Sequence, residues 1–475
     1  MNNIKLNRNK IIAMSLIFLS LVIFYLKVNP MYIFDTDDWL NIIPSRTILP
    51  QWKGWNPGKA TPEVILPVMT ILSKFLVYPF TKNIIDATAI VYGIFVAILV
   101  SVLFYQLLKI YDRDNKDSCL YVILLFVFLL ELFDIGDSQI TSVFASVNVT
   151  CVFNYLVPNV MNMILVCKLI QIDEGIVDID NTQYTKIGIY LLYIYLCMFS
   201  NLYSNVLPVI YASMTLIRYV IDKKKNKKLF LINGIIILLW VVCAFYEYNG
   251  GRATQIGDDS WLVHILDYVI TIWNVFKSIK PIVRNMMLAT IVVAVVLKSD
   301  RKKLLKLGIC QVLTVFYYVL LEAKAGSHMS EGSTRLSLVF YVVMMFVISL
   351  KIIYQNSPLE KLLMVGCPFL ICLLLSNFFL TIFNIRSMNF NNLDPQIAYN
   401  ISNDMIEQYE IAAENGENMV EIHIPDFYSD DNWPIAIYGA DRFSKAMFYY
   451  GDGGNYIEVS FVVDREKNKQ FKIYN

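Results

Sequence analysis

The sequence predicts an all-α polytopic membrane protein with a small α/β domain at its C-terminus. Of its 475 residues, 57% are hydrophobic and only 17% are charged, whereas an ordinary soluble domain has about 25% charged residues. Several uninterrupted apolar runs are about 20 residues long, which is the length that a helix needs to cross a bilayer. Toward the C-terminus these long runs give way to short alternating segments that are typical of strands.

Apolar runs predict about 11 transmembrane helices. Their approximate ranges are 11–28, 84–109, 118–135, 151–172, 187–202, 205–222, 229–248, 282–299, 304–322, 336–354 and 361–383. The first run is as long as a full span, and no small-residue cleavage site follows it. We therefore interpret it as a retained helix rather than a cleaved signal peptide.

The distribution of lysine and arginine predicts the orientation. These residues precede the first span at 5–10 and fill the loops 223–228 and 298–306. Because cytoplasmic loops carry an excess of positive charge, the N-terminus and both loops should face the cytoplasm. The segment from 384 to the C-terminus then lies outside the cell membrane.

The number of spans between the N-terminus and each of these basic loops must be even if all of them face the cytoplasm. This condition is met only if the apolar segment 64–81 does not cross the membrane. The segment carries Lys74 in its middle, and we expect an interfacial or re-entrant helix there on the outer side. The amphipathic segment 264–279 is likewise predicted to form an interfacial or re-entrant helix on the outer side.

The chain divides into a membrane domain, 1–385, and an extracytoplasmic α/β domain, 386–475. In the second domain, residues 393–414 predict an amphipathic helix that stops at Asn415-Gly416. Strand-like runs follow at 420–424, 435–438, 457–463 and 471–474.

Three acids, Asp35, Asp37 and Asp38, open the first outer loop beside Trp39. Carboxylates this close repel one another and are partly desolvated at the membrane face. Both effects raise a carboxylate pKa, as a general base requires. The alternative is an ordinary helix N-terminus, with Thr36 or Asp37 as the cap and the acids in the first turn.

Several cations occupy the same predicted face of the membrane. Lys59 follows Pro57-Gly58, Arg252 follows two glycines, and His328 precedes Arg335 at the start of a span. Exposed backbone N–H groups beside a guanidinium suit a phosphate, and cations could hold a phosphate leaving group. The alternatives are a plain turn around Arg252 and snorkelling of Arg335 to the interface.

Three motifs occur in an order that resembles a known family. They are Asp37-Asp38-Trp39, then Trp55-Asn56-Pro57-Gly58-Lys59, then Val152–Pro158. This part of the chain, about residues 10–385, is similar to bacterial polyisoprenyl-phosphate-dependent glycosyltransferases of the GT-C fold. The nearest group is the O-antigen glucosyltransferase-like membrane proteins.

The resemblance implies an inverting transfer of a sugar from an undecaprenyl-phosphate donor on the outer face, without a metal or cofactor. It implies Asp37 as the general base, with Asp38 as its orienting neighbour and Asp35 in reserve. The donor phosphate is expected to be bound by Arg252, Arg335, Lys59 and His328. The sugar or the acceptor is expected to contact Trp39, Trp55 and Tyr155. The partners would be the lipid-linked sugar, membrane lipid and an envelope glycan acceptor, and also a polyprenyl-phosphate sugar synthase and a flippase.

Two other functions stay open. A transporter or flippase of envelope precursors would keep ionisable residues near the bilayer midplane and often shows internal repeats, neither of which this sequence displays. A non-catalytic scaffold for envelope assembly would use 386–475 as a binding module. The net charge of +1 gives no support to nucleic-acid binding, and the cysteines and histidines lack metal-ligand spacing.

Overall fold

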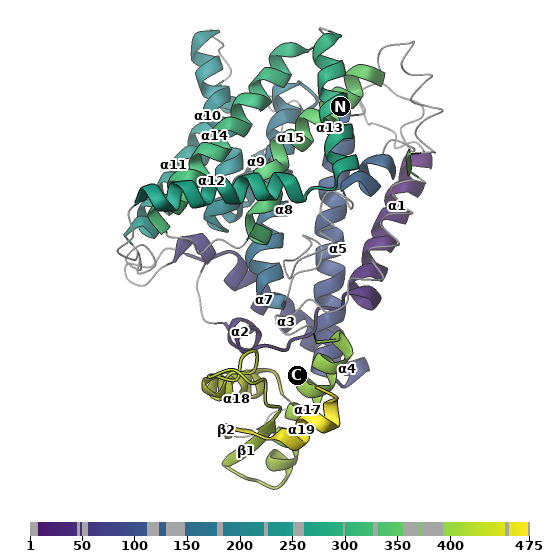
Figure 1. Ribbon diagram of the computed structural model, residues 1–475, viewed down its shortest axis with the longest axis vertical. Coiled ribbons are helices and arrows are strands. Elements are labelled where there is room, and N and C mark those ends of the chain that lie inside the picture. The colour runs from purple at the N-terminus through teal and green to yellow at the C-terminus, as the bar shows by residue number, and fades with distance from the viewer. Residues whose placement is uncertain are drawn as a thin grey trace.

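The computed structural model is a helical bundle with a small domain at one end (Figure 1). The described residues are 8–44, 48–49, 56–111, 123–129, 148–177, 184–222, 227–249, 261–297, 300–325, 331–354, 370–371, 393–451 and 456–473.

The bundle is formed by long helices and short connecting turns. Its elements are α1 (Arg8–Ile23), η1 (Phe24–Val28), α2 (Thr36–Asn41), η2 (Pro57–Lys59), α3 (Pro62–Leu76), α4 (Tyr78–Thr81), α5 (Ile84–Tyr111), α7 (Val149–Cys151), η3 (Val152–Leu156), α8 (Val157–Asp173), α9 (Tyr184–Met198), α10 (Leu202–Ile221), α11 (Lys227–Tyr248), α12 (Trp261–Ser278), α13 (Pro281–Val296), α14 (Arg301–Ala325) and α15 (Glu331–Tyr354).

Six described helices are long and apolar enough to cross a membrane. They are Lys10–Val28, Ile84–Tyr111, Val149–Asp173, Leu202–Ile221, Lys227–Tyr248 and Arg301–Leu321. A seventh follows if α12 and α13, which meet at 92°, form one broken span. These helices confirm the helical, apolar character predicted for the bundle.

The predicted number of 11 spans is not confirmed. The runs 187–202 and 336–354 do form helices, but their apolar parts, Thr185–Met198 and Ser337–Ile353, are shorter than a full span. The predicted spans 118–135 and 361–383 lie mostly outside the described residues.

The most enclosed span is Val149–Asp173, of which 89% is buried, whereas Lys10–Val28 is only 22% buried. The enclosed span packs between α5 and α10. Its polar side chains therefore need partners inside the bundle. The Asn162 amide, for example, donates to the hydroxyls of Ser200 and Ser204, each at 3.0 Å.

The segment 64–81 forms α3 and α4 at the end of the bundle that carries the small domain (Figure 1). Neither helix is among the candidate spans of the described chain. The Lys74 ammonium donates to the carbonyl of Gly451, in the small domain, at 2.9 Å. This contact explains Lys74 in the middle of an apolar segment, since its charge reaches a polar partner outside the bundle.

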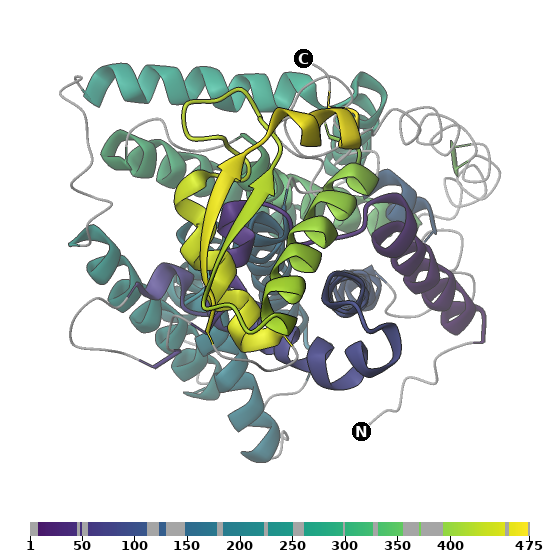
Figure 2. The same cartoon turned by 90° about the horizontal axis from the view of Figure 1, so that it is seen from below.

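The small domain, here called the tail domain, comprises the described residues from 393 to 473. Its elements are α17 (Pro395–Glu414), β1 (Met419–Ile424), η5 (Ile437–Gly439), α18 (Ala440–Tyr450), β2 (Glu458–Val463) and α19 (Arg465–Phe471). The two strands pair in parallel, from Met419 opposite Glu458 to Ile424 opposite Val463. They lie between α17 and α18 (Figure 2).

The predicted helix 393–414 and the strands 420–424 and 457–463 are confirmed, and Gly416 follows α17 with a φ of 72°. The strand predicted at 435–438 is wrong, because this segment turns into η5 and its backbone bonds to Thr36 of the bundle. The strand predicted at 471–474 is also wrong. Phe471 ends α19, which Asp464 caps at its N-terminus and Lys472 stops with a φ of 57°.

Candidate functional site

The loop that follows η1 folds into the short helix α2, and Asp35 caps it. The Asp35 backbone is extended, and its Oδ1 accepts the backbone N–H of Asp38 at 2.9 Å. The predicted caps were Thr36 and Asp37, but both lie inside the first turn. An acid at the cap and two in the first turn all suit the positive end of the helix dipole.

Asp35 and Asp38 are both buried, and each of their four carboxylate oxygens accepts a hydrogen bond. The Asn148 side-chain amide donates to Asp35 Oδ2. The Asp38 carboxylate accepts the backbone N–H of Thr150 at 2.7 Å and that of Phe34 at 3.2 Å. These bonds attach α2 to the start of the most enclosed span, so the pair fixes the loop to the bundle.

Burial of this pair changes its protonation. Desolvation is the largest effect and raises the pKa of Asp38 to about 6, against the lowering effect of its backbone donors. Desolvation, followed by repulsion from Asp38, raises the pKa of Asp35 well above its usual value. Because the two groups interact, they titrate as a unit. The raised carboxyl pKa values that the sequence predicts for this loop thus occur in Asp35 and Asp38, its two buried acids.

Asp37 is in a different environment. Its side chain is 47% exposed, and its carboxylate pairs with the Arg442 guanidinium of α18 at 3.2 Å. Arg442 also lies over the ring of Tyr438, at 5.2 Å from the ring centre. Of the three acids, Asp37 is therefore the one whose carboxylate a hydroxyl group in solution can approach.

The tail domain docks on α2 through backbone hydrogen bonds. Thr36 donates through its N–H and its hydroxyl to the carbonyl of Pro434, each at 3.0 Å, and its hydroxyl accepts the N–H of Ala436 at 2.8 Å. The Tyr450 hydroxyl donates to the carbonyl of Ile42 at 2.5 Å. Residues far apart in the sequence thus share one buried interface.

Close packing at Gly439 tightens this interface. A β-carbon at Gly439 would lie 2.8 Å from Cγ2 and 2.9 Å from Oγ1 of Thr36. These distances are shorter than van der Waals contact. Glycine at this position therefore allows the tail domain to approach α2 closely.

Trp39 belongs to the same interface. The indole is 3% exposed, donates to the carbonyl of Phe34 at 3.2 Å and packs edge-on against Phe443, with ring centres 4.8 Å apart. The predicted contact between Trp39 and a sugar does not fit this buried position. Its place indicates that it holds α2 against the tail domain.

Lys59 and Tyr155 lie in turns beside the acidic loop. Lys59 ends η2, whose Gly58 N–H donates to the Glu247 carboxylate of α11 at 2.9 Å. η2 leads into α3, which contacts both α2 and η3. Tyr155 is half-buried in η3, a π-helical turn, and such turns are frequent at functional sites. Lys59 thus precedes a helix that packs against α2, which carries Asp37 and Asp38.

The remaining predicted residues are not placed. Trp55, Arg252 and His328 lie outside the described residues, and Arg335 is described for its backbone in α15 but not for its side chain. Their roles stay predictions. Within the described part of the chain, no cluster of three or more His, Cys, Asp or Glu side chains could hold a metal ion.

Sequence reasoning missed the partners of the acids. Arg442, Asn148 and the N–H of Thr150 come from segments more than 100 residues away from α2. Arg442 lies among exposed polar residues of the amphipathic helix α18. Nothing in the local sequence pattern indicates that such an arginine contacts Asp37.

No protein-family model, curated protein or solved structure matches this chain. The residues and their geometry are therefore the basis for the function proposed for this protein.

Proposed function

We propose that this protein is a membrane glycosyltransferase of the GT-C type. It moves a sugar from a polyprenyl-phosphate donor to an envelope glycan or another acceptor, on the outer face of the membrane. The main support is the position of Asp37, a half-exposed carboxylate beside a buried acid pair, at the junction of bundle and tail domain.

In the proposed mechanism, Asp37 takes the proton from an acceptor hydroxyl as that oxygen attacks the anomeric carbon. The bond from the anomeric carbon to the phosphate oxygen breaks on the opposite face, so the configuration inverts. The electron pair leaves with the polyprenyl phosphate. Lys59 neutralises charge on the leaving group, together with Arg252, Arg335 and His328.

The buried pair supports this chemistry by position. The Asp35 and Asp38 carboxylates accept hydrogen bonds from Asn148 and Thr150, at the start of the enclosed span. These bonds fix the position of α2 and therefore of Asp37. Trp39 acts as a positioning residue through its packing against Phe443. Trp55 and Tyr155 are the proposed sugar contacts.

The tail domain would present the acceptor. Arg442 holds the Asp37 carboxylate toward α18, so the base faces the surface where the tail domain meets the bundle. A guanidinium beside the base can also bind hydroxyl oxygens of a glycan.

The test is sugar transfer by the full-length protein in membrane vesicles, with radiolabelled undecaprenyl-phosphate glucose or galactose as donor. Asp37→Asn keeps the size of the side chain but cannot take a proton, and we expect turnover to fall by about 10²–10⁴-fold. The matched control is Asp441→Asn, which removes another exposed carboxylate, 59% exposed and ion-paired with Lys445. It should retain full activity.

If wild type transfers sugar and Asp37→Asn does so equally well, Asp37 is not the base. If the wild type transfers no sugar from either donor but moves the labelled lipid across the vesicle membrane, the protein is a flippase.

A further inference from the structure

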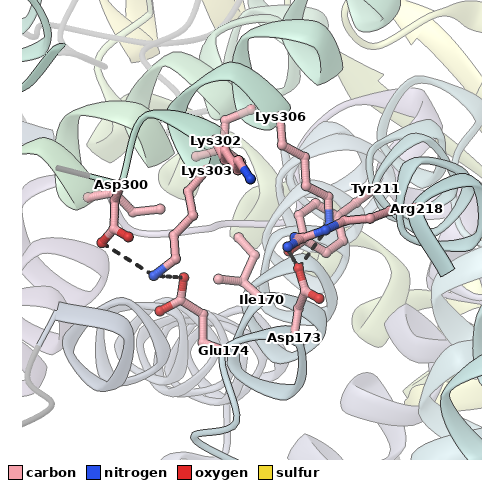
Figure 3. A pocket seen from close by; sticks show the side chains of 11 residues that line it. Ile170, Asp173, Glu174, Tyr211, Arg218, Asp300, Lys302, Lys303 and Lys306 are labelled. Atoms are coloured by element: carbon pink, nitrogen blue, oxygen red, sulfur yellow. Dashed lines mark hydrogen bonds and ion pairs between the residues drawn. The ribbon is translucent and has the colours of Figure 1, made fainter. Parts of the chain in front are cut away.

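A charged cavity of about 240 Å³ lies at the end of the bundle opposite the tail domain. It is bounded by the end of α8, the second half of α10, the start of α14 and one residue of α15. Figure 3 shows its charged side chains converging from α8, α10 and α14. On the orientation predicted from the basic loops, this end faces the cytoplasm.

The carboxylates of the lining pair with two lysines of α14, and Glu174 is also 4.0 Å from the Lys351 ammonium of α15. Lys306 binds Asp173 at 3.0 Å, and Lys303 binds Glu174 at 2.9 Å and Asp300 at 3.3 Å. These contacts occupy all three carboxylates that line the cavity. They also tie α14 to α8.

Two further cations line the cavity without a carboxylate there. Lys302 is exposed and has no ion-pair partner among the described residues. Arg218 pairs with Asp222 at 3.4 Å, but Asp222 is half-exposed and is not part of the lining. Among the described residues of the lining, four cations therefore face three carboxylates, which is an excess of one positive charge.

The start of α14 increases this positive potential. Its first turn contains Arg301, Lys302 and Lys303 and no acid. Cations at a helix N-terminus are unfavourable because the helix dipole is already positive there. Excess lysine agrees with a cytoplasmic loop, but topology alone does not require the cations to surround a cavity.

An ion-pair network that only tied helices together would need no excess cation and no open space. Buried ion pairs also contribute little net stability. We propose that the cavity binds a phosphate group, held between Lys302 and Arg218, from either an anionic lipid headgroup or free phosphate. Basic pockets between transmembrane helices bind anionic headgroups in this way.

The size of the cavity agrees with this ligand. Pockets for drug-sized ligands measure about 300–1,000 Å³, so a volume of about 240 Å³ suits a headgroup phosphate better than a whole nucleotide. The proposed site is at the other end of the bundle from Asp37 and is independent of the proposed sugar transfer.

The test measures binding to the full-length protein in a neutral detergent by thermophoresis. The probes are short-chain phosphatidylglycerol, short-chain phosphatidylcholine and sodium phosphate. Lys302→Gln and Arg218→Gln should each weaken binding about tenfold, as expected for one charge-assisted contact. Asp300→Asn should tighten it, because the change removes a negative charge and asparagine tolerates the positive φ of 52° at this position.

The control is Lys445→Gln, which removes an exposed lysine of the tail domain and should leave binding unchanged. Preferential binding of phosphatidylglycerol identifies a lipid headgroup, and equal binding of sodium phosphate identifies the free ion. The proposal is overturned if neither binds, if phosphatidylcholine binds as well as phosphatidylglycerol, or if Lys302→Gln and Arg218→Gln bind like the wild type. Because Lys302 is exposed, its substitution should not affect folding, and a melting curve of each variant checks this.

Discussion

The buried acid pair should make the protein more stable as the pH falls from 7 toward 4, opposite to the usual effect of acid. The pKa of Asp38 rises from 3.8 to about 6 on folding, mainly because the group loses water. A carboxyl group whose pKa is higher in the folded state binds its proton more tightly there. Its contribution is therefore fully favourable below pH 3.8 and is lost as the pH rises through 6.

The magnitude follows from the shift. A change of about two pKa units corresponds to about 3 kcal/mol in the free energy of unfolding. Asp35 acts in the same direction, since burial and the nearby Asp38 also raise its pKa. Asp38→Asn should remove the contribution of Asp38, so the free energy of unfolding should depend less steeply on pH.

The assay is thermal unfolding of the full-length protein in a non-ionic detergent at pH 4.5, 5.5, 6.5 and 7.5. The comparison is between slopes, because any lost hydrogen bond in Asp38→Asn destabilises equally at every pH. Asp441→Asn, at an exposed site, controls for a general change in charge. The reasoning is refuted if the wild type and Asp38→Asn lose stability in parallel from pH 4.5 to 7.5.

Two further predictions concern docking and orientation. Thr36→Val keeps the shape of the side chain but leaves the buried N–H of Ala436 without its acceptor, so the interface between α2 and the tail domain should weaken by about 1–3 kcal/mol. The measurement is the urea concentration at which a protease releases the tail domain. The control Thr36→Ser keeps the hydroxyl and should behave nearly like the wild type. In a cysteine-free variant, Lys469→Cys should react with an impermeant thiol reagent in intact cells and Lys302→Cys only after permeabilisation. Reaction of both in intact cells would contradict the orientation.

Patterns that depend on neighbouring residues were predictable from the sequence. The helix α17 has an amphipathic repeat and a stop at Asn415-Gly416, and β1 and β2 alternate in burial. The long apolar helices follow from hydropathy over a window of residues. In each case the signal is local, and the tertiary contacts agree with it.

Features set by distant contacts were not predictable. The segment 435–438 has strand-like residues, but its neighbouring backbone groups bond to Thr36, about 400 positions earlier. The cap of α2 is another case, because Asp35, Thr36 and Asp37 are all good caps. Asn148, from another part of the chain, donates a hydrogen bond to Asp35. The sequence pattern around α2 therefore does not indicate which of the three residues is the cap.

The hydrogen bonds between Thr36 and the segment from Pro434 to Ala436 also set an order of events during synthesis. The two partners are 400 residues apart, and ribosomes add about 5–20 residues per second. The loop that carries Asp37 therefore emerges about 20–80 seconds before the segment that covers it. A chain that terminates early keeps the loop uncovered and lacks Arg442. The region around Asp37 is thus complete only after the segment that contains Pro434, Ala436 and Arg442 has been made.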